Sequence, residues 1–457
     1  MVKRLNPLDL GFLMAESRES MFHVASLLTF SAREDLSPDY FRELIEQYHD
    51  PSEVQSPWNL KLKTPGLLKN PLQSWVLDKN MDPDYHVRRA ALPAPGGERE
   101  LGTIVSHLHG QAIDFHRPPW EMHLIEGLPN NRFALYMKVH HSLVDGYTGV
   151  QMLNRAMSKT PDDPDTPLFY TVRNPSRSPR SESDGPDFGQ LLTNSVKSIL
   201  NVGQVAFRRS LKRDIENLVS WNQAPQSVLN GRITRNRRFA TQDFSLPLLK
   251  DLAKASGGSL NDIVLALCGG ALRRFLLDQD ALPEKSLIAM LPVNIRPKND
   301  PGGGNAVGAI LATLGTDIAD PRQRLETIIS STSRAKELIS GLSATEIMAS
   351  SAMLMSPLGM QIARAVTGIN AKIPINCNVV ISNVPGPTEH LYFRGSRLET
   401  NFPVSIPMHG LALNITCYSY VDRLCFGFIG CRDALPHLQR LAVYTGETMN
   451  ELETILG

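Results

Sequence analysis

The clearest alternation of hydrophobic and polar positions lies at residues 132–140. Phe133, Leu135, Met137 and Val139 occupy every second position there. A period of two is typical of a β-strand that buries one face. We therefore predict a strand over these residues, with the four apolar side chains on its buried face.

The spacing of apolar positions changes after this strand. Val150, Leu153 and Met157 follow one another at the intervals of a helix. Gly146 lies between the two patterns, and glycine allows a sharp change of chain direction. The region is therefore predicted to be a strand, a tight loop and a helix.

Similar patterns along the rest of the chain predict a mixed α/β protein. Strands are expected at residues 22–30, 85–92, 286–293, 307–317 and 377–382, and a hairpin at 411–431. Helices are expected at residues 40–48, 98–113, 259–278, 320–340, 344–356 and 433–454. These elements fall into a first domain at residues 1–160 and a second domain at residues 236–457.

Residues 161–235 are predicted to connect the two domains. The segment 158–187 contains six prolines among serines and charged residues, a composition typical of a linker. A basic amphipathic helix is expected at residues 188–221. Such a helix could lie on an anionic membrane surface, or it could simply cross from one domain to the other.

The composition limits the functions that the chain can have. Its 457 residues are 42% hydrophobic and carry a net charge of +1, so no global charge attracts nucleic acid. No run reaches the 18 apolar residues of a transmembrane helix, and the N-terminus lacks the apolar core of a signal peptide. Five cysteines without metal-binding spacing are expected to be reduced and buried. These features favour a cytoplasmic protein.

The candidate chemistry follows the strand at residues 132–140, in His140-His141-Ser142-Leu143-Val144-Asp145-Gly146. Histidine is the side chain best suited to move a proton near neutral pH, because its unperturbed pKa is about 6.5. Asp145 could bond an imidazole directly, or it could fix the loop through an arginine elsewhere. Two histidines at a strand end can also have no functional role, and the pattern alone leaves these alternatives open.

This seven-residue segment resembles the signature of bifunctional wax ester synthase/diacylglycerol acyltransferases. Further segments resemble that family in the same order along the chain: Asn6-Pro7-Leu8-Asp9, Pro118-Pro119-Trp120-Glu121, Leu229-Asn230-Gly231, Arg237-Arg238, Asn261-Asp262, Pro292-Val293-Asn294-Ile295-Arg296 and Ser382-Asn383-Val384-Pro385-Gly386-Pro387. In the second of these, Pro119 replaces a leucine of the family pattern. Each segment is weakly specific alone, whereas the ordered set is highly specific.

The resemblance implies both a fold and an activity. It implies two chloramphenicol-acetyltransferase-like domains packed face to face, with a channel between them. It also implies an enzyme that moves a fatty acyl group from acyl-CoA to a long-chain alcohol or to diacylglycerol. Acyl-CoA is then a substrate, and no cofactor, metal or nucleic acid is expected. Such an enzyme is expected to contact the inner membrane or lipid inclusions peripherally.

The resemblance assigns roles to the histidine segment. His141 is the expected general base, and His140 is expected to support the geometry of the loop. Asp145 is expected to be structural, pairing with Arg296, while Gly146 completes the motif. A buried pair of this kind is costly to break on one side only, by about 3–5 kcal/mol.

Other residues are candidates for binding the substrates. The candidates for oxyanion or channel contacts are Asn261, Ser382 and Asn383. An acyl tunnel could be lined by Met355, Leu358 and Met360, although methionines at helical spacing are more often core residues. Asp262 follows Ser259 in a capping pattern and is expected to begin a helix rather than to catalyse. Trp120 is expected to be a core anchor.

Other functions would make different demands on the sequence. A serine hydrolase using Ser142 and His141 would need a nucleophile elbow, but the chain has no G-x-S-x-G segment. A metalloenzyme would need a ligand cluster such as H-E-x-x-H, which is also absent. A condensation-type acyltransferase acting on another acceptor and a non-catalytic lipid-binding or droplet-coating protein remain as alternatives.

Overall fold

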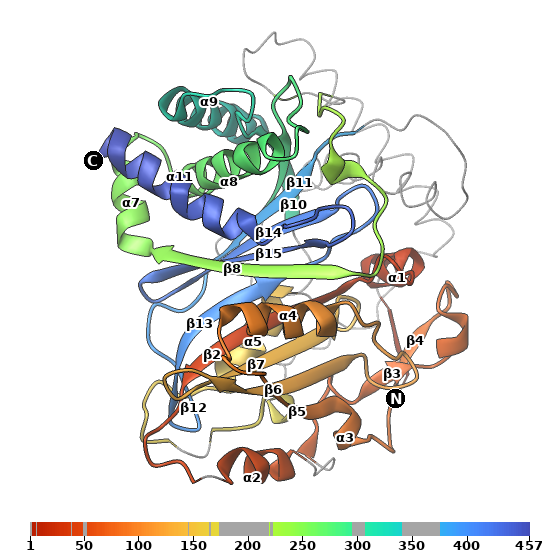
Figure 1. The fold of residues 1–457 in the computed structure, drawn as a ribbon. Helices are drawn as coiled ribbons and strands as arrows, with labels where there is room; N and C mark the ends of the chain where they lie inside the picture. Colours follow the sequence, from red (N-terminus) through yellow and green to blue (C-terminus); the bar gives the residue numbers. More distant parts are fainter. Residues whose placement is uncertain are drawn as a thin grey trace.

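A computed structural model provides the fold, shown in Figure 1. It describes residues 2–5, 7–37, 39–48, 53–144, 146–163, 166–172, 219, 223–294, 307–340 and 375–457. Two six-stranded sheets and a small three-stranded sheet organise this part of the chain.

The first six-stranded sheet forms the centre of the first domain. Its strands lie in the order β12 (Tyr392–Phe393), β13 (Ser396–Val404), β2 (His23–Ser31), β7 (Arg132–His140), β6 (Trp120–Leu128) and β5 (Val87–Ala91). Neighbouring strands are antiparallel except for β5 and β6. The strand predicted at residues 132–140 is confirmed as β7, but the expectation that it buries only one face was wrong. Phe133 and Leu135 enter one core, whereas Ala134 and Tyr136 enter another on the opposite face, because helices cover both sides of the sheet.

Helices cover both faces of this sheet. The helices α2 (Tyr40–Gln47) and α5 (Gly146–Arg155) pack on the face that carries Phe133. The helix α4 (Glu98–His109) packs on the opposite face, beside Tyr136. The remaining short elements of this half are β1 (Val2–Arg4), α1 (Pro7–Ala15), β3 (Leu60–Leu62), η2 (Pro65–Leu67), β4 (Ser74–Leu77), α3 (Pro83–His86) and η3 (Phe169–Thr171).

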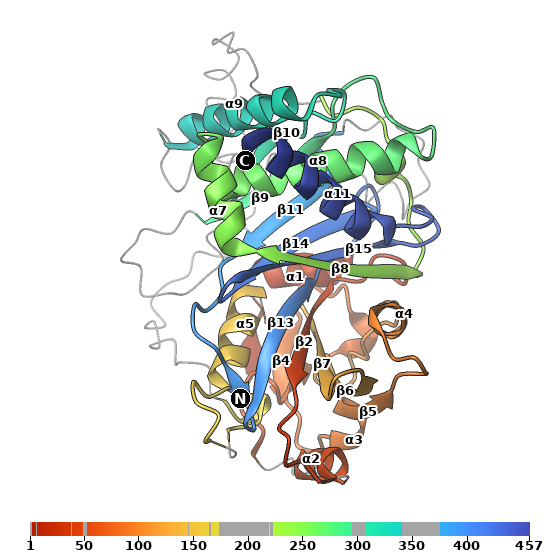
Figure 2. The ribbon, with the colours of Figure 1, turned by 60° about the vertical axis from the view of Figure 1, so that its left-hand side comes forward.

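The second six-stranded sheet forms the second domain. Its strands lie in the order β10 (Val307–Thr313), β9 (Ile288–Asn294), β11 (Val379–Val384), β14 (Leu413–Tyr420), β15 (Arg423–Cys431) and β8 (Arg237–Ser245). The strand β11 runs parallel to both neighbours, and the other pairs are antiparallel. One face is covered by α7 (Leu246–Ala255), α8 (Leu260–Leu277), α9 (Pro321–Ser340) and α11 (Arg440–Leu456), as Figures 1 and 2 show. The short helix η4 (Val228–Asn230) precedes β8.

The two domains meet through the face of the second sheet that these helices leave open. Phe239 of β8 and Cys425 and Ile429 of β15 lie in one core with α4 and the first sheet. Gly427 of β15 faces β13 so closely that a Cβ atom there would lie 1.9 Å from the carbonyl oxygen of Pro403. The missing side chain at this position therefore allows the two backbones to approach.

The predicted domain boundaries need correction in two places. The strands β12 and β13 follow most of the second domain in sequence, yet they complete the first sheet, so residues 236–457 are not one continuous domain. Phe169 and Tyr170, placed in the expected connection at residues 161–235, are buried in the core of the first domain. Leu229, from the same range, is buried in the core of the second domain.

Most of the other predicted elements that fall on described residues are confirmed. The strand predicted at 22–30 is β2, and the helix predicted at 98–113 is α4, which ends earlier, at His109. The five cysteines are free, and all except Cys377 are buried. The helices expected at 188–221 and 344–356 lie outside the described residues, apart from Val219 in the first. None of the helices that the structure describes combines the length and the apolarity needed to cross a membrane.

Candidate active site

The histidine loop begins where β7 ends. The amide nitrogen of His140 donates to the carbonyl oxygen of Pro119 at 2.9 Å, and that of His141 donates to Phe22 at 2.9 Å. Leu143 then donates to the carbonyl oxygen of His140 at 2.9 Å, which closes a tight turn. These backbone bonds fix both histidines against the neighbouring chain segments.

His140 is completely buried, and both of its ring nitrogens are occupied. Its Nδ1 accepts hydrogen bonds from the hydroxyl of Ser142 at 2.6 Å and from the amide of Ser142 at 3.2 Å. The hydrogen of the neutral ring is then on Nε2, which lies 3.3 Å from Oε2 of Glu16. The ring of Phe115 packs edge-on against this imidazole. His140 is thus a rigid part of the loop, consistent with the supporting role expected from the sequence.

The serine of the segment pairs with the first histidine rather than the second. Ser142 is 2% exposed and hydrogen bonds His140, so it does not form a dyad with His141. This arrangement provides a second reason, beyond the missing nucleophile elbow, against a serine hydrolase.

His141 has a different environment. It is only partly buried, and its ring packs on that of Phe12 with the centroids 4.4 Å apart. Phe12 also contacts the ring of Phe22, whose carbonyl oxygen receives the amide hydrogen of His141. The imidazole is therefore oriented by an aromatic wall and by its own backbone; its Nδ1 is buried, while the residue as a whole is partly exposed.

Glu16 is a site residue that the sequence reasoning missed. Its buried carboxylate accepts the amide hydrogen of Phe22 at 2.6 Å and faces Nε2 of His140 at 3.3 Å. It therefore links the supports of both histidines. The available signal was an acidic residue shortly after the Asn6-Pro7-Leu8-Asp9 segment, but nothing in its spacing reveals a contact with residue 140.

Two expectations for the loop have different outcomes. Asp145 and Arg296 lie outside the described residues, so their pairing stays a prediction. Gly146 is the first residue of α5; its φ is not positive, and a Cβ atom there would meet no atom within 4 Å. The predicted order of strand, tight loop and helix is confirmed, and Gly146 begins the helix in a conformation that other residues could also adopt.

The other candidate residues belong to the second domain. Asn383 of β11 donates through Nδ2 to Oδ1 of Asn261 on α8 at 2.8 Å. Ser382, the residue before Asn383 on β11, is partly buried. The structure thus brings Asn261 and Asn383 together, as a pair held within the second domain. Met355, Leu358 and Met360 lie outside the described residues.

The structural roles expected for Asp262 and Trp120 are confirmed. One oxygen of Asp262 accepts from the amide and hydroxyl of Ser259 at 2.7 and 2.6 Å, which caps α8. Its other oxygen accepts from the hydroxyl of Thr332 at 2.6 Å, joining α8 to α9. Trp120 is fully buried, and its indole N–H donates to the carbonyl oxygen of Trp58 at 2.7 Å.

A buried ion pair joins the neighbouring strands β6 and β7 shortly before the loop. Lys138 is completely buried; its Nζ lies 3.3 Å from Glu121 and donates to the carbonyl oxygens of Leu108 and Gln111 at 3.0 and 3.1 Å. Burial alone would raise the pKa of the Glu121 carboxyl, but His123 and the charge of Lys138 lower it to about 2. This pair ties β6, β7 and the end of α4 together under the site.

The comparisons with known proteins agree along the whole chain. A family model described as the wax ester synthase/diacylglycerol acyltransferase catalytic domain matches residues 5–264, and the C-terminal domain model of the same family matches residues 303–453. The chain belongs to the wax ester synthase/diacylglycerol acyltransferase family. It is thus an acyltransferase, as the sequence resemblance indicated.

Relatives of this acyltransferase cover its full length. A putative diacylglycerol O-acyltransferase of Mycobacterium tuberculosis is 48% identical over 100% of this chain and 98% of its own. The O-acyltransferase WSD of Acinetobacter baylyi is 35% identical, with the same coverage. The solved wax ester synthase/diacylglycerol acyltransferase of Marinobacter aquaeolei is 38% identical, covers 100% of both chains and superposes with a TM-score of 0.81.

More distant structures confirm the expected fold class. The first condensation domain of the calcium-dependent antibiotic synthetase has a TM-score of 0.58 at 16% identity, over 99% of this chain and 95% of its own. At this identity the likeness concerns the fold alone. The two-domain mixed α/β architecture expected from the resemblance is therefore confirmed. Among the described residues, no group of three or more histidines, cysteines or carboxylates is placed to hold a metal ion.

Proposed function

We propose that this acyltransferase moves a fatty acyl group from acyl-CoA to a long-chain alcohol or to diacylglycerol, with His141 as general base. The observation that carries the proposal is the contrast between the two histidines. His140 is fully buried with both nitrogens engaged, whereas His141 is partly exposed at the end of β7. We therefore assign the contact with the bound substrate to the second ring.

The reaction needs one base and no covalent intermediate. His141 takes the proton of the acceptor hydroxyl while the hydroxyl oxygen attacks the thioester carbonyl carbon. The tetrahedral intermediate collapses, the carbon–sulfur bond breaks, and the proton passes from the imidazolium to the departing thiolate. The products are an ester and free CoA. The proposed reaction uses acyl-CoA as a substrate and requires neither a metal nor a cofactor.

The oxyanion of the intermediate needs a hydrogen-bond donor. Asn261, Ser382 and Asn383 remain our candidates. The bond from Asn383 to Asn261 uses one of the two amide hydrogens of Asn383, so the pair retains donors for a ligand. We also propose that the lipid substrates are met at a membrane or lipid-inclusion surface, which the protein contacts peripherally.

The acceptor is tested by competition. Purified protein is given palmitoyl-CoA with equal amounts of hexadecanol and dioleoylglycerol, and the products are separated. We expect wax ester, triacylglycerol or both, together with one free thiol per ester. Thiol release without an ester product would contradict the transferase proposal.

The absence of an acyl-enzyme is tested separately. Intact-mass spectrometry is performed after incubation with palmitoyl-CoA and no acceptor. We expect the mass of the chain to stay unchanged, because Ser142 is buried and bonded to His140. A palmitoyl adduct that disappears when hexadecanol is added would replace the single-step mechanism by a two-step one.

A further inference from the structure

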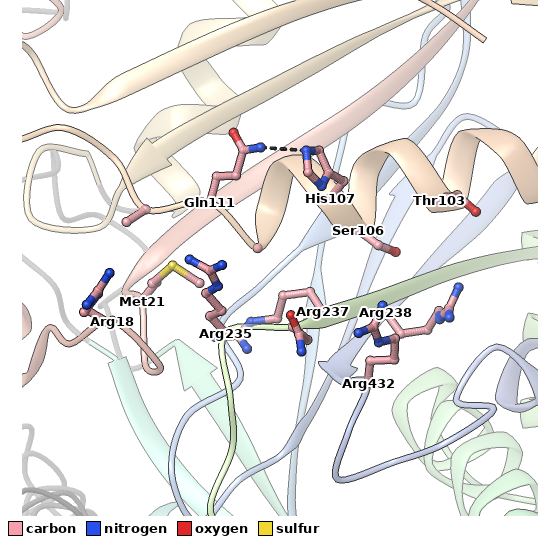
Figure 3. A pocket seen from close by; sticks show the side chains of 13 residues that line it. Arg18, Met21, Thr103, Ser106, His107, Gln111, Arg235, Arg237, Arg238 and Arg432 are labelled. Carbon is pink, nitrogen blue, oxygen red and sulfur yellow. Dashed lines mark hydrogen bonds between the residues drawn. The ribbon is translucent and has the colours of Figure 1, made fainter. Parts of the chain in front are cut away.

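A cavity of about 570 Å³ lies between the two domains, beside α4. Its walls come from the second half of α4 and the residues that follow it, from the segment before β2, and from the start of β8 (Figure 3). The lining includes Arg18, Met21, His107, Gln111 and Arg432.

The charge of this cavity is strongly one-sided. Five arginines line it: Arg18, Arg235, Arg237, Arg238 and Arg432. None of the described residues that line it carries a carboxylate. Asp433, outside the lining, accepts from Nδ2 of Asn236 at 2.7 Å and lies 3.5 Å from Nε of Arg432. The chain as a whole has a net charge of only +1, so this concentration is local. Like charges gathered in a concave site attract an anion.

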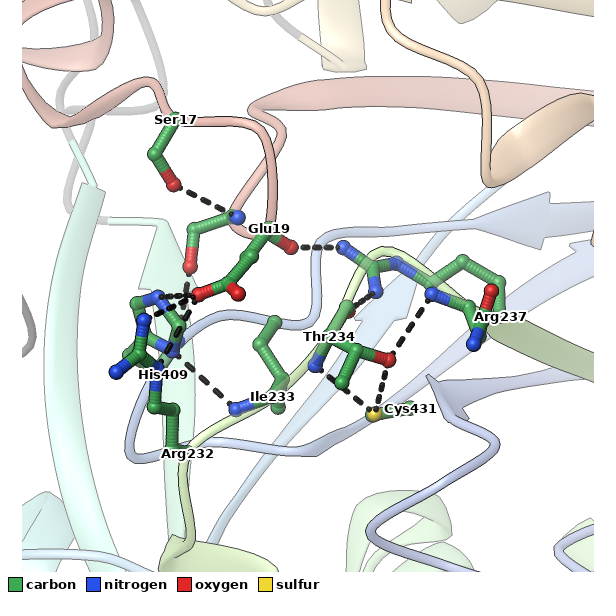
Figure 4. Close-up of polar contacts among 10 residues, drawn as sticks. Ser17, Glu19, Arg232, Ile233, Thr234, Arg237, His409 and Cys431 are labelled. Carbon is green, nitrogen blue, oxygen red and sulfur yellow. Dashed lines mark hydrogen bonds and ion pairs between the residues drawn. The ribbon is translucent and has the colours of Figure 1, made fainter.

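One arginine is fixed in place by the contact between the domains. Arg237 is 4% exposed, and its guanidinium donates to the carbonyl oxygen of Glu19 at 2.6 Å and to that of Thr234 (Figure 4). The carboxylate of Glu19 in turn forms an ion pair with Arg232 at 2.9 Å and lies 3.4 Å from Nε2 of His409. Burial lowers the pKa of Arg237 to about 10, which leaves the group charged at neutral pH.

A second arginine has an unused donor. Within the described part of the chain, Nε of Arg238 is buried without a hydrogen-bond partner. A buried donor without a partner is costly, by about 1–3 kcal/mol, unless a ligand supplies the acceptor. Figure 3 shows Arg235, Arg237 and Arg238 in a row at the start of β8, on the side of the cavity opposite α4.

The walls of the cavity are held at a fixed distance. The amide of Phe239 donates to the hydroxyl of Ser106 at 2.8 Å. A Cβ atom at Gly110 would lie 3.1 Å from the carbonyl oxygen of Arg235, and one at Gly102 would lie 3.2 Å from that of Phe239. The helix and the strand therefore pack backbone against backbone, and the arginines are presented on a rigid frame.

The cavity shares a wall with the candidate catalytic residue. Met21 lines the cavity, and the next residue, Phe22, accepts the amide hydrogen of His141. Glu16 holds the amide of Phe22 from the other side. A ligand anchored among the arginines is thus bound at the same short segment that positions His141.

We propose that this arginine cavity binds the phosphate groups of the nucleotide part of CoA. The inference rests on the proposed function, because acyl-CoA is its donor substrate. CoA carries a 3′-phosphate and a diphosphate, and the planar guanidinium fork matches phosphate oxygens in two-point contacts. A phospholipid headgroup presents the same phosphate chemistry, so the experiment separates the two sources.

The test uses binding to the full chain as its readout. Arg235→Gln, Arg238→Gln and the double variant are compared with Arg99→Gln, an exposed arginine at the other end of α4 that does not line the cavity. Arg18→Gln, also exposed, serves as a second cavity variant. Isothermal titration measures the Kd of CoA and of dephospho-CoA, and sedimentation measures binding to phosphatidylglycerol vesicles.

The expected result is specific to the nucleotide. The double variant should bind CoA about 10- to 100-fold more weakly, because it loses two charge-assisted contacts. The double variant should prefer CoA over dephospho-CoA less strongly than the parent protein does. Arg99→Gln should bind CoA like the parent protein, and the melting temperatures of all variants should stay unchanged. The KM for palmitoyl-CoA should rise in parallel, and the KM for hexadecanol should not.

Two outcomes would overturn the inference. Unchanged CoA affinity in the double variant and in Arg18→Gln, with ester formation intact, would reject the cavity while leaving the proposed function standing. Loss of vesicle binding with unchanged CoA affinity would assign the arginines to lipid phosphate instead. If the parent protein forms no ester from palmitoyl-CoA, the proposed function itself fails, and this result is distinguishable from both.

Discussion

Single residues of the histidine loop differ in what they can do, because their surroundings differ. His140 and His141 are neighbours in sequence, yet one is sealed between Ser142 and Glu16 and the other keeps an exposed part. The sequence pattern alone could not separate their roles, because both histidines simply lie at the end of the same predicted strand. The contact with Glu16 distinguishes the surroundings of the two rings and supports the proposed assignment, and it joins segments far apart in the chain.

Removing the carboxylate of Glu16 tests this arrangement. Glu16→Ala leaves the amide of Phe22 and Nε2 of His140 buried without their acceptor, so the free energy of unfolding should fall by about 2–4 kcal/mol. Glu16→Gln keeps one oxygen acceptor and should recover about half of that loss. Urea unfolding of both variants measures the difference. Equal free energies of unfolding for the two variants and the parent would show that the carboxylate of Glu16 does not stabilise the fold.

Elements whose pattern is local were the ones that the sequence could predict. The strand β7 was predicted because every second residue is apolar, and the capping of α8 was predicted because Ser259 and Asp262 lie three positions apart. The strands β12 and β13 were assigned to the wrong domain, since their sequence does not say which sheet they join. The arginine cavity could not be predicted either, because α4 and β8 are brought together only by the tertiary fold.

The pairing of β6 and β7 predicts a pH-dependent stability. The folded pKa of Glu121, about 2, lies below its ordinary value of 4.5. Its contribution is therefore fully present above pH 4.5 and is lost as the pH falls from 4.5 toward 2, with a total of about 3 kcal/mol. Glu121→Gln should cost about 3–5 kcal/mol at pH 7 and progressively less in acid.

A matched control is available on the same strand. Glu126 forms an ion pair with Arg89 at the partly exposed end of β6, and Glu126→Gln should change the free energy of unfolding by less than about 1 kcal/mol at every pH. Urea unfolding between pH 7 and pH 3 gives both differences. A cost for Glu121→Gln that does not vary with pH would contradict the assigned role of the pair.

On the scale of the whole molecule, the two six-stranded sheets are built from alternating parts of the sequence. The strands β12 and β13 lie among the strands of the second domain in sequence but belong to the first sheet. The strand β13 also lies against β15 at Gly427. The arginine cavity and the contacts around Glu19 lie along the same interface. The domains are therefore expected to unfold together, and the site between them depends on their fixed arrangement.

A methyl group added where β15 lies against β13 tests whether the site depends on the close contact between the domains. Gly427→Ala would place a Cβ atom 1.9 Å from the carbonyl oxygen of Pro403, so the strands must separate. We expect a loss of about 1–3 kcal/mol or more in the free energy of unfolding and a lower rate of acyl transfer. Gly66→Ala is the control, because no atom lies within 4 Å of the added Cβ. If Gly427→Ala unfolds like Gly66→Ala, the close contact between the domains is not essential.

In the proposed mechanism, His141 is the base that activates the acceptor. The most direct measurement is the rate of thiol release from palmitoyl-CoA with hexadecanol for the parent protein, His141→Ala and the exposed control His116→Ala. We expect His141→Ala to be slower by about 10²–10⁴-fold, with an unchanged melting temperature, while the control keeps the parent rate. A His141→Ala variant that releases thiol and forms ester within a few-fold of the parent rate would contradict this mechanism.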